Sequence, residues 1–587
     1  MSASASTSHR SVLKYLYNHN PFYVISAVLM LFAVRSAYGT IEIGSINCWI
    51  MMGVLAGYTL LLAGIGVLIV RWGKVWEDAR SILLLLLLLF LGVSVSMDDL
   101  FSRISPEQGM TLMIAGFLFS VLVSEAVLWG AGIRLGARYR IPYHLFLALF
   151  YVAPWWCSPE MHPRSAVELE WTLFLFPVIA SFLFLCLLPA IRGGVSYVKS
   201  NGTPWGWPWF PWIAFGVIAA CVSLRSFALS LTFGPAGPMW IQSGSGPRLI
   251  SFDTLWGFYF LIPLGFVLLL LLLEGGLVTQ NKAFQTRILR LSPWLLLLAM
   301  PATTGPVHIG FLFKVTDVIG SPIWITLWLL VGFYLWAMVR RVPGALWAGL
   351  GTVALFSIVG PETLGSATLI DPTPWPLLLD GAVLLILGFT KRSSGICTAG
   401  VLAATLGLWL VIPETILFQY RFTACFHFLW ISILVLGLTM NDSFSRGLQC
   451  ASAMLVPLVS IVVILNERAV EIPLLWRLTY VSSWAIGCFM ISRLWSVRWF
   501  LYSFMATLSI LLYTSATYAF RLAIQYFSRE AVIAFVWSAG ALLLAFLISA
   551  HKARWLPEYS WMLPRKETPP EAEILSPPPE NSSGNEG

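Results

Sequence analysis

Residues 81–97 read SILLLLLLLFLGVSVSM and contain no charged side chain, whereas Arg80 precedes them and Asp98 and Asp99 follow directly. An α-helix needs about 20 apolar residues to cross the hydrocarbon core of a bilayer. This run is close to that length and is bounded by charge at both ends. It therefore predicts a transmembrane helix, and the rest of the chain repeats the pattern.

The whole chain has the composition of a membrane protein. Only 11% of its 587 residues are charged, whereas a soluble domain carries about 25%. The sequence predicts an all-α polytopic fold with about 18 transmembrane helices. The predicted spans are 21–38, 47–70, 81–97, 109–131, 141–157, 170–191, 209–234, 254–273, 291–312, 319–339, 343–359, 373–390, 394–412, 422–440, 447–465, 472–491, 499–519 and 530–550. The weakest are 21–38, which contains Arg35, and 291–312, which Pro301 and Pro306 interrupt.

Positive charges fall into every second gap between these spans. Of the 35 Lys and Arg residues, 24 lie in gaps of one parity, 8 in gaps of the other, and three inside spans. Basic residues stay on the cytoplasmic side of a membrane. The pattern therefore predicts that both termini are cytoplasmic, and we expect the protein in the cell membrane (plasma or inner membrane).

The sequence divides into three parts. We expect residues 1–20 to be a cytoplasmic segment and 21–551 to be the transmembrane body. The tail 552–587 is rich in proline and in acidic and small polar residues. Such a composition is typical of disorder.

The body also shows signs of a parallel internal duplication with a shift of eight helices. An even shift preserves helix direction, as in some transporter folds. The two halves would be about 21–280 and 281–491, followed by two further helices in 499–550. Regularly spaced helices can also produce such matches by coincidence. The matched residues are Glu107 with Glu362, Glu125 with Asp380, Glu160 with Glu414, and Arg192 with Arg446.

Charged side chains inside the spans are the main candidates for a site, because each costs a few kcal/mol to insert. We expect Arg35 to reach the outer surface. Arg225 has apolar residues on both sides, and we expect Glu125 or Asp380 to pair with it. The three residues Glu125, Arg225 and Asp380 are therefore predicted either to bind a substrate or ion, or to form a buried pair that fixes helix packing.

Carboxylates in the outer gaps form a second, weaker group: Glu107, Glu160, Glu362 and Glu414, each directly after a proline. Proline and a carboxylate both suit the first turn of a helix, which explains Glu107 well. A ring of carboxylates that collects cations is the alternative. Asp98-Asp99 is interpreted as the acidic end of a helix, because a cytosolic metal site does not fit an outer gap.

Tryptophans at 205, 207, 209 and 212 alternate with prolines at 204, 208 and 211 in an inner gap. Indole rings favour the headgroup region of a membrane, and the prolines oppose helix formation. We expect this segment to lie along the inner interface. A functional aromatic groove is the alternative.

No cofactor or metal site is predicted. The cysteines show no CxxC spacing, the histidines have no common spacing, and no GxxxxGK[ST] loop is present. No basic cluster suggests nucleic-acid binding. The expected partners are the lipid bilayer and a small-molecule or ion substrate, with the oligomeric state left open.

The leading functional hypothesis is a secondary transporter of a small solute or a lipid. One alternative is a membrane-embedded transferase acting on a lipid-linked substrate. The first outer gap is short and holds only Glu42, and no outer domain is present, which disfavours an enzyme. The other alternative is a non-catalytic scaffold or assembly subunit, in which the buried charges serve packing alone.

Overall fold

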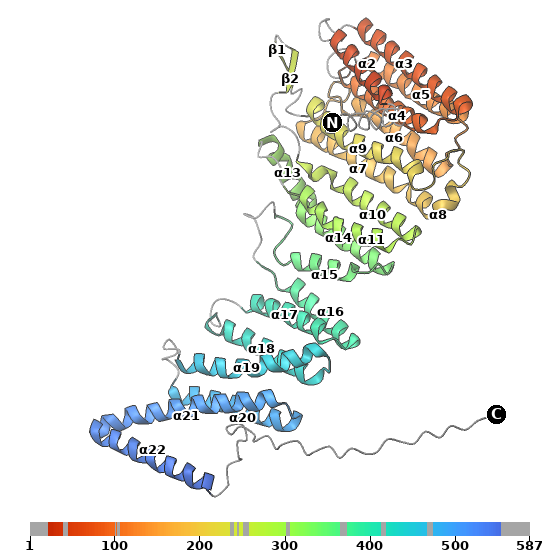
Figure 1. The fold of residues 1–587 in the computed structure, drawn as a ribbon. Coiled ribbons are helices and arrows are strands. Elements are labelled where there is room, and N and C mark those ends of the chain that lie inside the picture. The colour runs from red at the N-terminus through yellow and green to blue at the C-terminus, as the bar shows by residue number, and fades with distance from the viewer. Residues whose placement is uncertain are drawn as a thin grey trace, which may run out of the picture. The chain divides into compact units, whose positions relative to one another are not determined.

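The computed structural model describes residues 21–38, 45–99, 101, 106–234, 240–243, 246–249, 257–300, 306–363, 372–412, 418–465 and 473–552. Almost all of these residues are helical (Figure 1). Thirteen of the described helices are long and apolar enough to cross a membrane. The chain is thus an all-helical, multi-pass membrane protein, which confirms the predicted class.

Two compact units make up the chain, Met1–Ser432 and Ile433–Gly587. The helices of the first unit are α2 (Phe22–Tyr38), α3 (Ser45–Leu68), η1 (Ile69–Gly73), α4 (Trp76–Asp99), α5 (Pro106–Gly130), α6 (Ala137–Cys157), α7 (Ala166–Leu185), α8 (Leu188–Val198), α9 (Trp209–Phe233), η4 (Phe258–Leu261), α10 (Ile262–Val278), α11 (Lys282–Leu291), η5 (Ser292–Trp294), α12 (Leu295–Leu298), α13 (Pro306–Ile319), α14 (Pro322–Val339), α15 (Ala345–Leu355), α16 (Trp375–Lys391) and α17 (Ser394–Val411). An antiparallel ribbon of β1 (Trp240–Ser243) and β2 (Gly246–Leu249) follows α9. Helix α18 (Phe418–Thr439) contains the division between the units.

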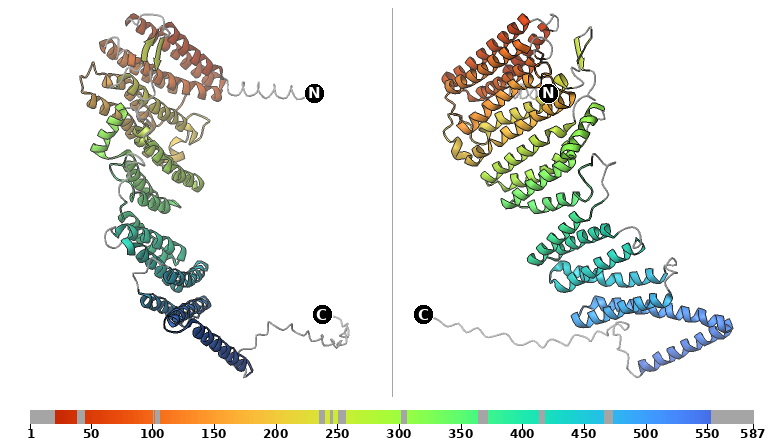
Figure 2. Two further views of the ribbon diagram at one scale, coloured as in Figure 1. Left: turned by 90° about the vertical axis from the view of Figure 1, so that its left-hand side faces the viewer. Right: turned by 180° about the vertical axis from the view of Figure 1, so that it is seen from behind.

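The second unit contains α19 (Ser443–Leu465), α20 (Leu474–Trp495), α21 (Arg498–Tyr526) and α22 (Arg529–Lys552). Helices α19, α20 and α21 pack against one another, and α20 and α21 lie side by side (Figure 2). Arg477 is partly buried in α20 and donates a hydrogen bond to the carbonyl of Ile464. This guanidinium therefore has a protein partner near the helix end.

Five of the 18 predicted spans are not among the thirteen long apolar helices. Helices α2 and α16 have 17 residues each, and α15 has 11. Helix α6 is long enough, but Arg138 and Arg140 in its first turn make it less apolar. The predicted span 291–312 is divided into η5, α12 and α13, and Pro306 begins α13. Proline suits the first turn of a helix but not its interior.

The described ends of the divided segment 291–319 lie near opposite ends of α14. At one end, the hydroxyls of Ser292 and Tyr334 are 2.7 Å apart, and Tyr334 lies near the end of α14. At the other end, Ile319 almost adjoins Pro322, which begins α14. The segment therefore supports the predicted alternation of helices after it, although the span count and the side of each terminus remain predictions.

Contacts between residues of different gaps agree with the predicted sides of the membrane. The backbone amide of Arg134 donates a hydrogen bond of 2.7 Å to the carbonyl of Asn201, and both residues lie in predicted inner gaps. In two outer gaps, Ser158 donates to the carbonyl of Phe101 at 3.1 Å. Lys314, in an outer gap, lies 2.9 Å from Glu170 at the outer end of its span. Each contact joins chain segments that the charge pattern assigns to one side.

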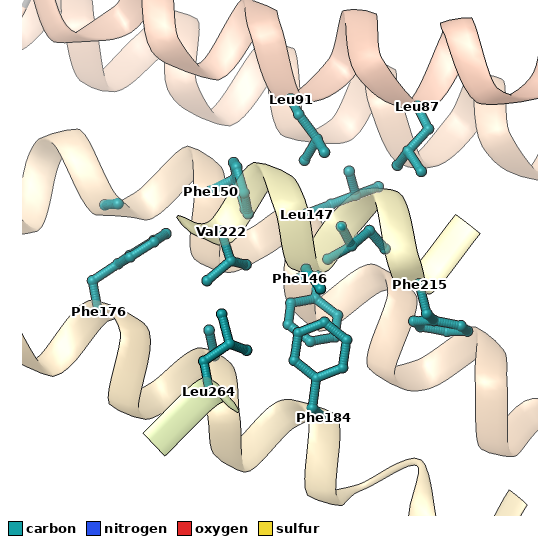
Figure 3. Close-up of a cluster of buried hydrophobic side chains, with 14 of the residues drawn as sticks. Leu87, Leu91, Phe146, Leu147, Phe150, Phe176, Phe184, Phe215, Val222 and Leu264 are labelled. Atoms are coloured by element: carbon teal, nitrogen blue, oxygen red, sulfur yellow. The ribbon is translucent and has the colours of Figure 1, made fainter. Parts of the chain in front are cut away.

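A large apolar core occupies the first unit, between α4, α6, α7, α9 and α10 (Figure 3). Interlocking aromatic rings form its centre. The rings of Phe146 and Phe184 are 4.5 Å apart, and those of Phe150 and Phe176 are 5.8 Å apart. Lipid tails are as apolar as these side chains, so close packing rather than exclusion from water holds the helices together. Several side chains of this core, including Leu87, Phe90 and Phe215, also line the cavity described below.

Helices α16 and α17 lie side by side and pack closely through glycines (Figure 2). A Cβ atom on Gly400 would lie 2.9 Å from the amide nitrogen of Leu385 and 3.0 Å from the carbonyl oxygen of Gly381. Backbone atoms cannot move aside as a flexible side chain can. The packing of this helix pair therefore requires glycine at position 400.

We expect Gly400→Ala to destabilise the protein by about 1–3 kcal/mol, the usual cost of overpacking. The matched control is Gly332→Ala in the middle of α14, where nothing lies within 4 Å of the added Cβ. Both changes gain the same helix propensity from alanine, so their difference isolates the clash. The measurement is the Tm of each purified variant in detergent. Equal Tm values for the two variants would contradict the close packing.

Candidate functional site

An apolar cavity of about 400 Å³ lies between α4, α5, α6 and the segment 204–215, all within the first unit. Aliphatic side chains of α4 and α5 form one side, and aromatic side chains of the segment form the other. The main wall residues are Leu83, Leu87, Phe90, Val127, Trp205 and Phe215. Cavities of this size are typical of small-molecule sites in proteins, about 300–1,000 Å³.

A tight turn holds the aromatic wall in place. The side-chain oxygen of Asn201 accepts a hydrogen bond from the amide of Thr203 at 2.8 Å, and its amide group donates to the carbonyl of Trp205 at 3.2 Å. Gly202 has a φ of 80°, and the carbonyl of Gly132 lies where its Cβ would be. Only glycine fits both the conformation and the space. The turn thus fixes Trp205, which packs edge-on against Trp76 with 5.5 Å between ring centres.

The same segment was expected either to lie along the membrane interface or to form an aromatic groove. Trp205 and Trp209 both line the cavity. The side chain of Trp209 is also 68% exposed, which suits an indole ring in the headgroup region. Two of its tryptophans thus line a cavity and one is exposed, so the interface and the functional groove both stay predictions.

Polar groups of the cavity are few. The hydroxyls of Ser124 and Tyr143 are 2.8 Å apart in its wall, one on α5 and the other on α6. Arg80, at the inner end of α4, is the one charged residue among those that line it, and it is exposed. The cavity is thus apolar in its depth and positively charged at its edge.

Glu125 lies next to Ser124 on α5 but does not line the cavity. Its carboxylate accepts two hydrogen bonds from Arg140, one of them at 2.6 Å from Nε. The Nε2 atom of His144 lies 3.2 Å from Glu125 Oε1. These groups join α5 to the start of α6, so the charge of Glu125 is already neutralised.

The expected pairing of Arg225 with Glu125 or Asp380 is wrong. Arg225 is 1% exposed and donates two hydrogen bonds to Asp98, one of 2.6 Å to Oδ1. It donates a third to the carbonyl of Ser94 at 3.3 Å. Asp98 lies in the last turn of α4, which ends at Asp99. The acidic helix end was recognised in the sequence, but its partner was missed. The predicted spans give only a coarse signal, because Asp98 directly follows one span and Arg225 lies in the predicted outer half of another.

Asp380 is buried in α16 at 4% exposure. Its Oδ1 atom accepts no hydrogen bond from any residue that the structure describes. It lies next to Gly381, whose Cβ position faces the backbone of α17. Glu125, Arg225 and Asp380 thus contact different helices, and none of the three lines the cavity.

Sequence reasoning missed a further charged cluster around Glu274 of α10, which is fully buried. It accepts a hydrogen bond from the indole of Trp336 at 2.9 Å. Arg192 lies 3.4 Å from it and Arg340 lies 3.6 Å from it. Both guanidiniums also lie over the Trp336 ring, within 5.8 Å of its centre. The basic inner gaps were recognised, but Glu274 itself lay just outside a predicted span and was not singled out.

Three of the four carboxylates of the predicted outer gaps lie in the described part of the chain. Glu107 lies in the first turn of α5, as predicted for a residue that complements the helix dipole. Glu160 and Glu362 are exposed in turns, and Glu414 lies outside the described residues. The described chain contains no group of three His, Cys, Asp or Glu residues that could hold a metal ion. The side chain of Arg35 also lies outside the described part.

The matched residues of the proposed duplication have different environments. Glu125 lies near the end of α5, whereas Asp380 lies near the start of α16. Glu107 is helical, whereas Glu362 lies in a turn. The duplication stays a prediction.

No family model, curated protein or solved structure matches this chain. The functional proposal therefore rests on the cavity, on Arg80 in its lining and on the buried charges of the helices.

Replacing one member of the Asp98–Arg225 pair should destabilise the protein strongly. Arg225→Met leaves a buried carboxylate without its partner, which typically costs about 3–5 kcal/mol. The double variant Asp98→Leu/Arg225→Met removes both charges and should recover most of that loss. The measurement is a double-mutant cycle on Tm in detergent. Losses that simply add in the double variant would show that the two side chains act independently.

Proposed function

We propose that this protein is a membrane transport protein for a lipid with an anionic headgroup, which it takes up from the inner leaflet. The observation that carries the proposal is the cavity beside the aromatic segment, with one guanidinium at its edge. This proposal selects the lipid from the two substrate classes that the sequence allowed.

The chemistry of the cavity favours a lipid over a polar solute. A polar solute or a bare ion needs several hydrogen-bonding or charged ligands, because burial without them is costly. Here the wall is aliphatic and aromatic, apart from the Ser124–Tyr143 hydroxyl pair. An acyl or isoprenoid chain fits such a wall and needs no polar partner.

The charge at the edge selects the headgroup. Arg80 and the aromatic segment belong to gaps of the parity that carries 24 of the basic residues, which by the positive-inside rule face the cytoplasm. Anionic headgroups of that leaflet are attracted by about 1 kcal/mol for each nearby basic residue. A phosphate at Arg80 with its chain in the cavity satisfies both parts of the site. This orientation supports a location in the cell membrane.

Asp380 is the residue that we propose for coupling to an ion gradient. Buried carboxylates in membrane spans are paired or take part in ion and proton movement. Arg225 and Glu125 each have a partner of opposite charge, Asp98 and Arg140, whereas Asp380 Oδ1 accepts no hydrogen bond from the described residues. Protonation or cation binding would relieve the cost of this burial.

Two other functions stay open to experiment. Chemical modification of a labelled lipid by the purified protein would favour a transferase. Failure to bind any lipid, together with tight co-purification of one protein partner, would favour a scaffold.

The cavity can be tested by binding a fluorescent phosphatidylglycerol to the purified protein. Arg80→Gln should weaken binding by about fivefold, the equivalent of about 1 kcal/mol, and should leave binding of a zwitterionic analogue unchanged. The matched control is Arg71→Gln, because Arg71 is exposed near Arg80 but does not line the cavity. Ala214→Trp should fill the cavity and abolish binding of both lipids. Full binding by a folded Ala214→Trp variant would refute the site.

Coupling can be tested separately by lipid flux in vesicles with and without a proton gradient. Asp380→Asn should remove the effect of the gradient but leave lipid binding intact, because the residue lies away from the cavity. Glu107→Gln is the control, since that carboxylate is exposed in the first turn of α5. A gradient effect of undiminished size in Asp380→Asn would assign coupling to another group.

A further inference from the structure

A second apolar cavity, of about 310 Å³, lies between α3, α4, α5 and α6. None of its described lining residues is charged. Its walls include Trp49 and Met52 of α3, Val93 of α4 and Leu112 of α5. Phe90 of α4 lines this cavity and also the first one. The two hollows are therefore neighbours, and one aromatic side chain lies between them.

The cavities follow one another along the same helices. On α6, Tyr143 lines the first cavity and Tyr151 the second, which corresponds to a shift of about 12 Å along the helix axis. On α5, the first cavity is lined near residue 127 and the second near residue 116, about 16 Å apart. These shifts are about half of the roughly 30 Å hydrocarbon core. Each cavity thus lies at the depth of one leaflet.

A short series of hydroxyl groups connects the two depths. Ser124 pairs with Tyr143 at 2.8 Å, and Ser120 pairs with Tyr151 at 2.7 Å. The two serines are one helical turn apart on α5, so they lie on the same face. Hydroxyl groups can rotate to donate or accept a hydrogen bond. They can therefore bind a polar headgroup in turn where the surroundings are otherwise apolar.

Phe90 is the residue that the two cavities share. Its side chain is 3% exposed and is packed among the leucines of α4 and the neighbouring helices. We propose that the two cavities are consecutive binding positions on one path, along which the lipid crosses from the inner to the outer leaflet, with Phe90 as the gate. This inference rests on the proposed function of the first cavity.

The two positions differ in charge. Arg80 holds an anionic headgroup at the first position, whereas the described lining of the second position offers hydroxyl groups alone. A headgroup is therefore bound more weakly at the second position, and we expect the lipid to spend more time at the first.

The experiment uses the full chain in vesicles that contain a fluorescent phosphatidylglycerol, with transfer between leaflets followed by chemical quenching from outside. Phe90→Ala should speed transfer severalfold, and Phe90→Trp should slow it severalfold. Phe176→Ala is the control, because Phe176 is a fully buried phenylalanine that lines neither cavity. It should reduce Tm without changing transfer in the folded fraction.

A photoactivatable phosphatidylglycerol separates failure of the inference from failure of the proposed function. Wild-type protein should be labelled in both cavities, near Trp205 and near Met52. Folded Phe90→Trp should be labelled near Trp205 alone, and Phe90→Ala should gain label near Met52. Labelling of wild type near Trp205 alone, with transfer rates unaffected at position 90, would overturn the path while leaving the first cavity as a binding site. Absence of label from both cavities would overturn the proposed function itself.

Discussion

The buried ion pair between Asp98 and Arg225 is the interaction on which the geometry of the site depends. It joins the C-terminal end of α4 to the C-terminal half of α9. The N-terminal parts of the same two helices, from Arg80 to Phe90 and from Trp209 to Phe215, line the cavity. Phe90 and Phe215 lie about 12 and 15 Å along their helices from the paired residues. The two helices are thus fastened at one end and separated by the cavity at the other.

A second constraint comes from the bilayer, which offers no water to unpaired backbone groups. Non-helical backbone at membrane depth is therefore tolerated only where protein surrounds it or where it lines a cavity. The segment before α9 satisfies this condition, because Asn201 and Thr203 bind its backbone and Trp205 lines the cavity. The break in the helix before α9 and the cavity therefore have a common cause. Prolines at 204, 208 and 211 prevent a regular helix, and the irregular segment leaves room beside α4.

Much of the fold could be predicted from the sequence because hydropathy and length act locally. The run 81–97 became part of α4, and even the weak span 291–312 was recognised as interrupted at Pro306. The site was harder, because a pairing depends on which helices become neighbours. Asp98 is one residue beyond the predicted span and was interpreted as part of an acidic helix end, so it was not considered as a partner for Arg225, although it lies within the last turn of α4. The cavity could not be read from the sequence at all, since its walls come from four separate segments whose packing no local pattern specifies.

Three other carboxylates of the helices also have cationic partners, and Asp380 differs from them in this respect. Glu274 binds Trp336 and lies beside two guanidiniums, Glu170 pairs with Lys314, and Glu125 pairs with Arg140. In each case a carboxylate on one helix meets a cation from another helix or gap, which compensates the cost of removing both from water. A carboxylate with no such partner among the described residues keeps that cost unless it takes up a proton or a cation. Among the buried carboxylates that the structure describes, Asp380 is therefore the one for which no cationic partner is seen, and this is the physical basis for proposing it as the coupling residue.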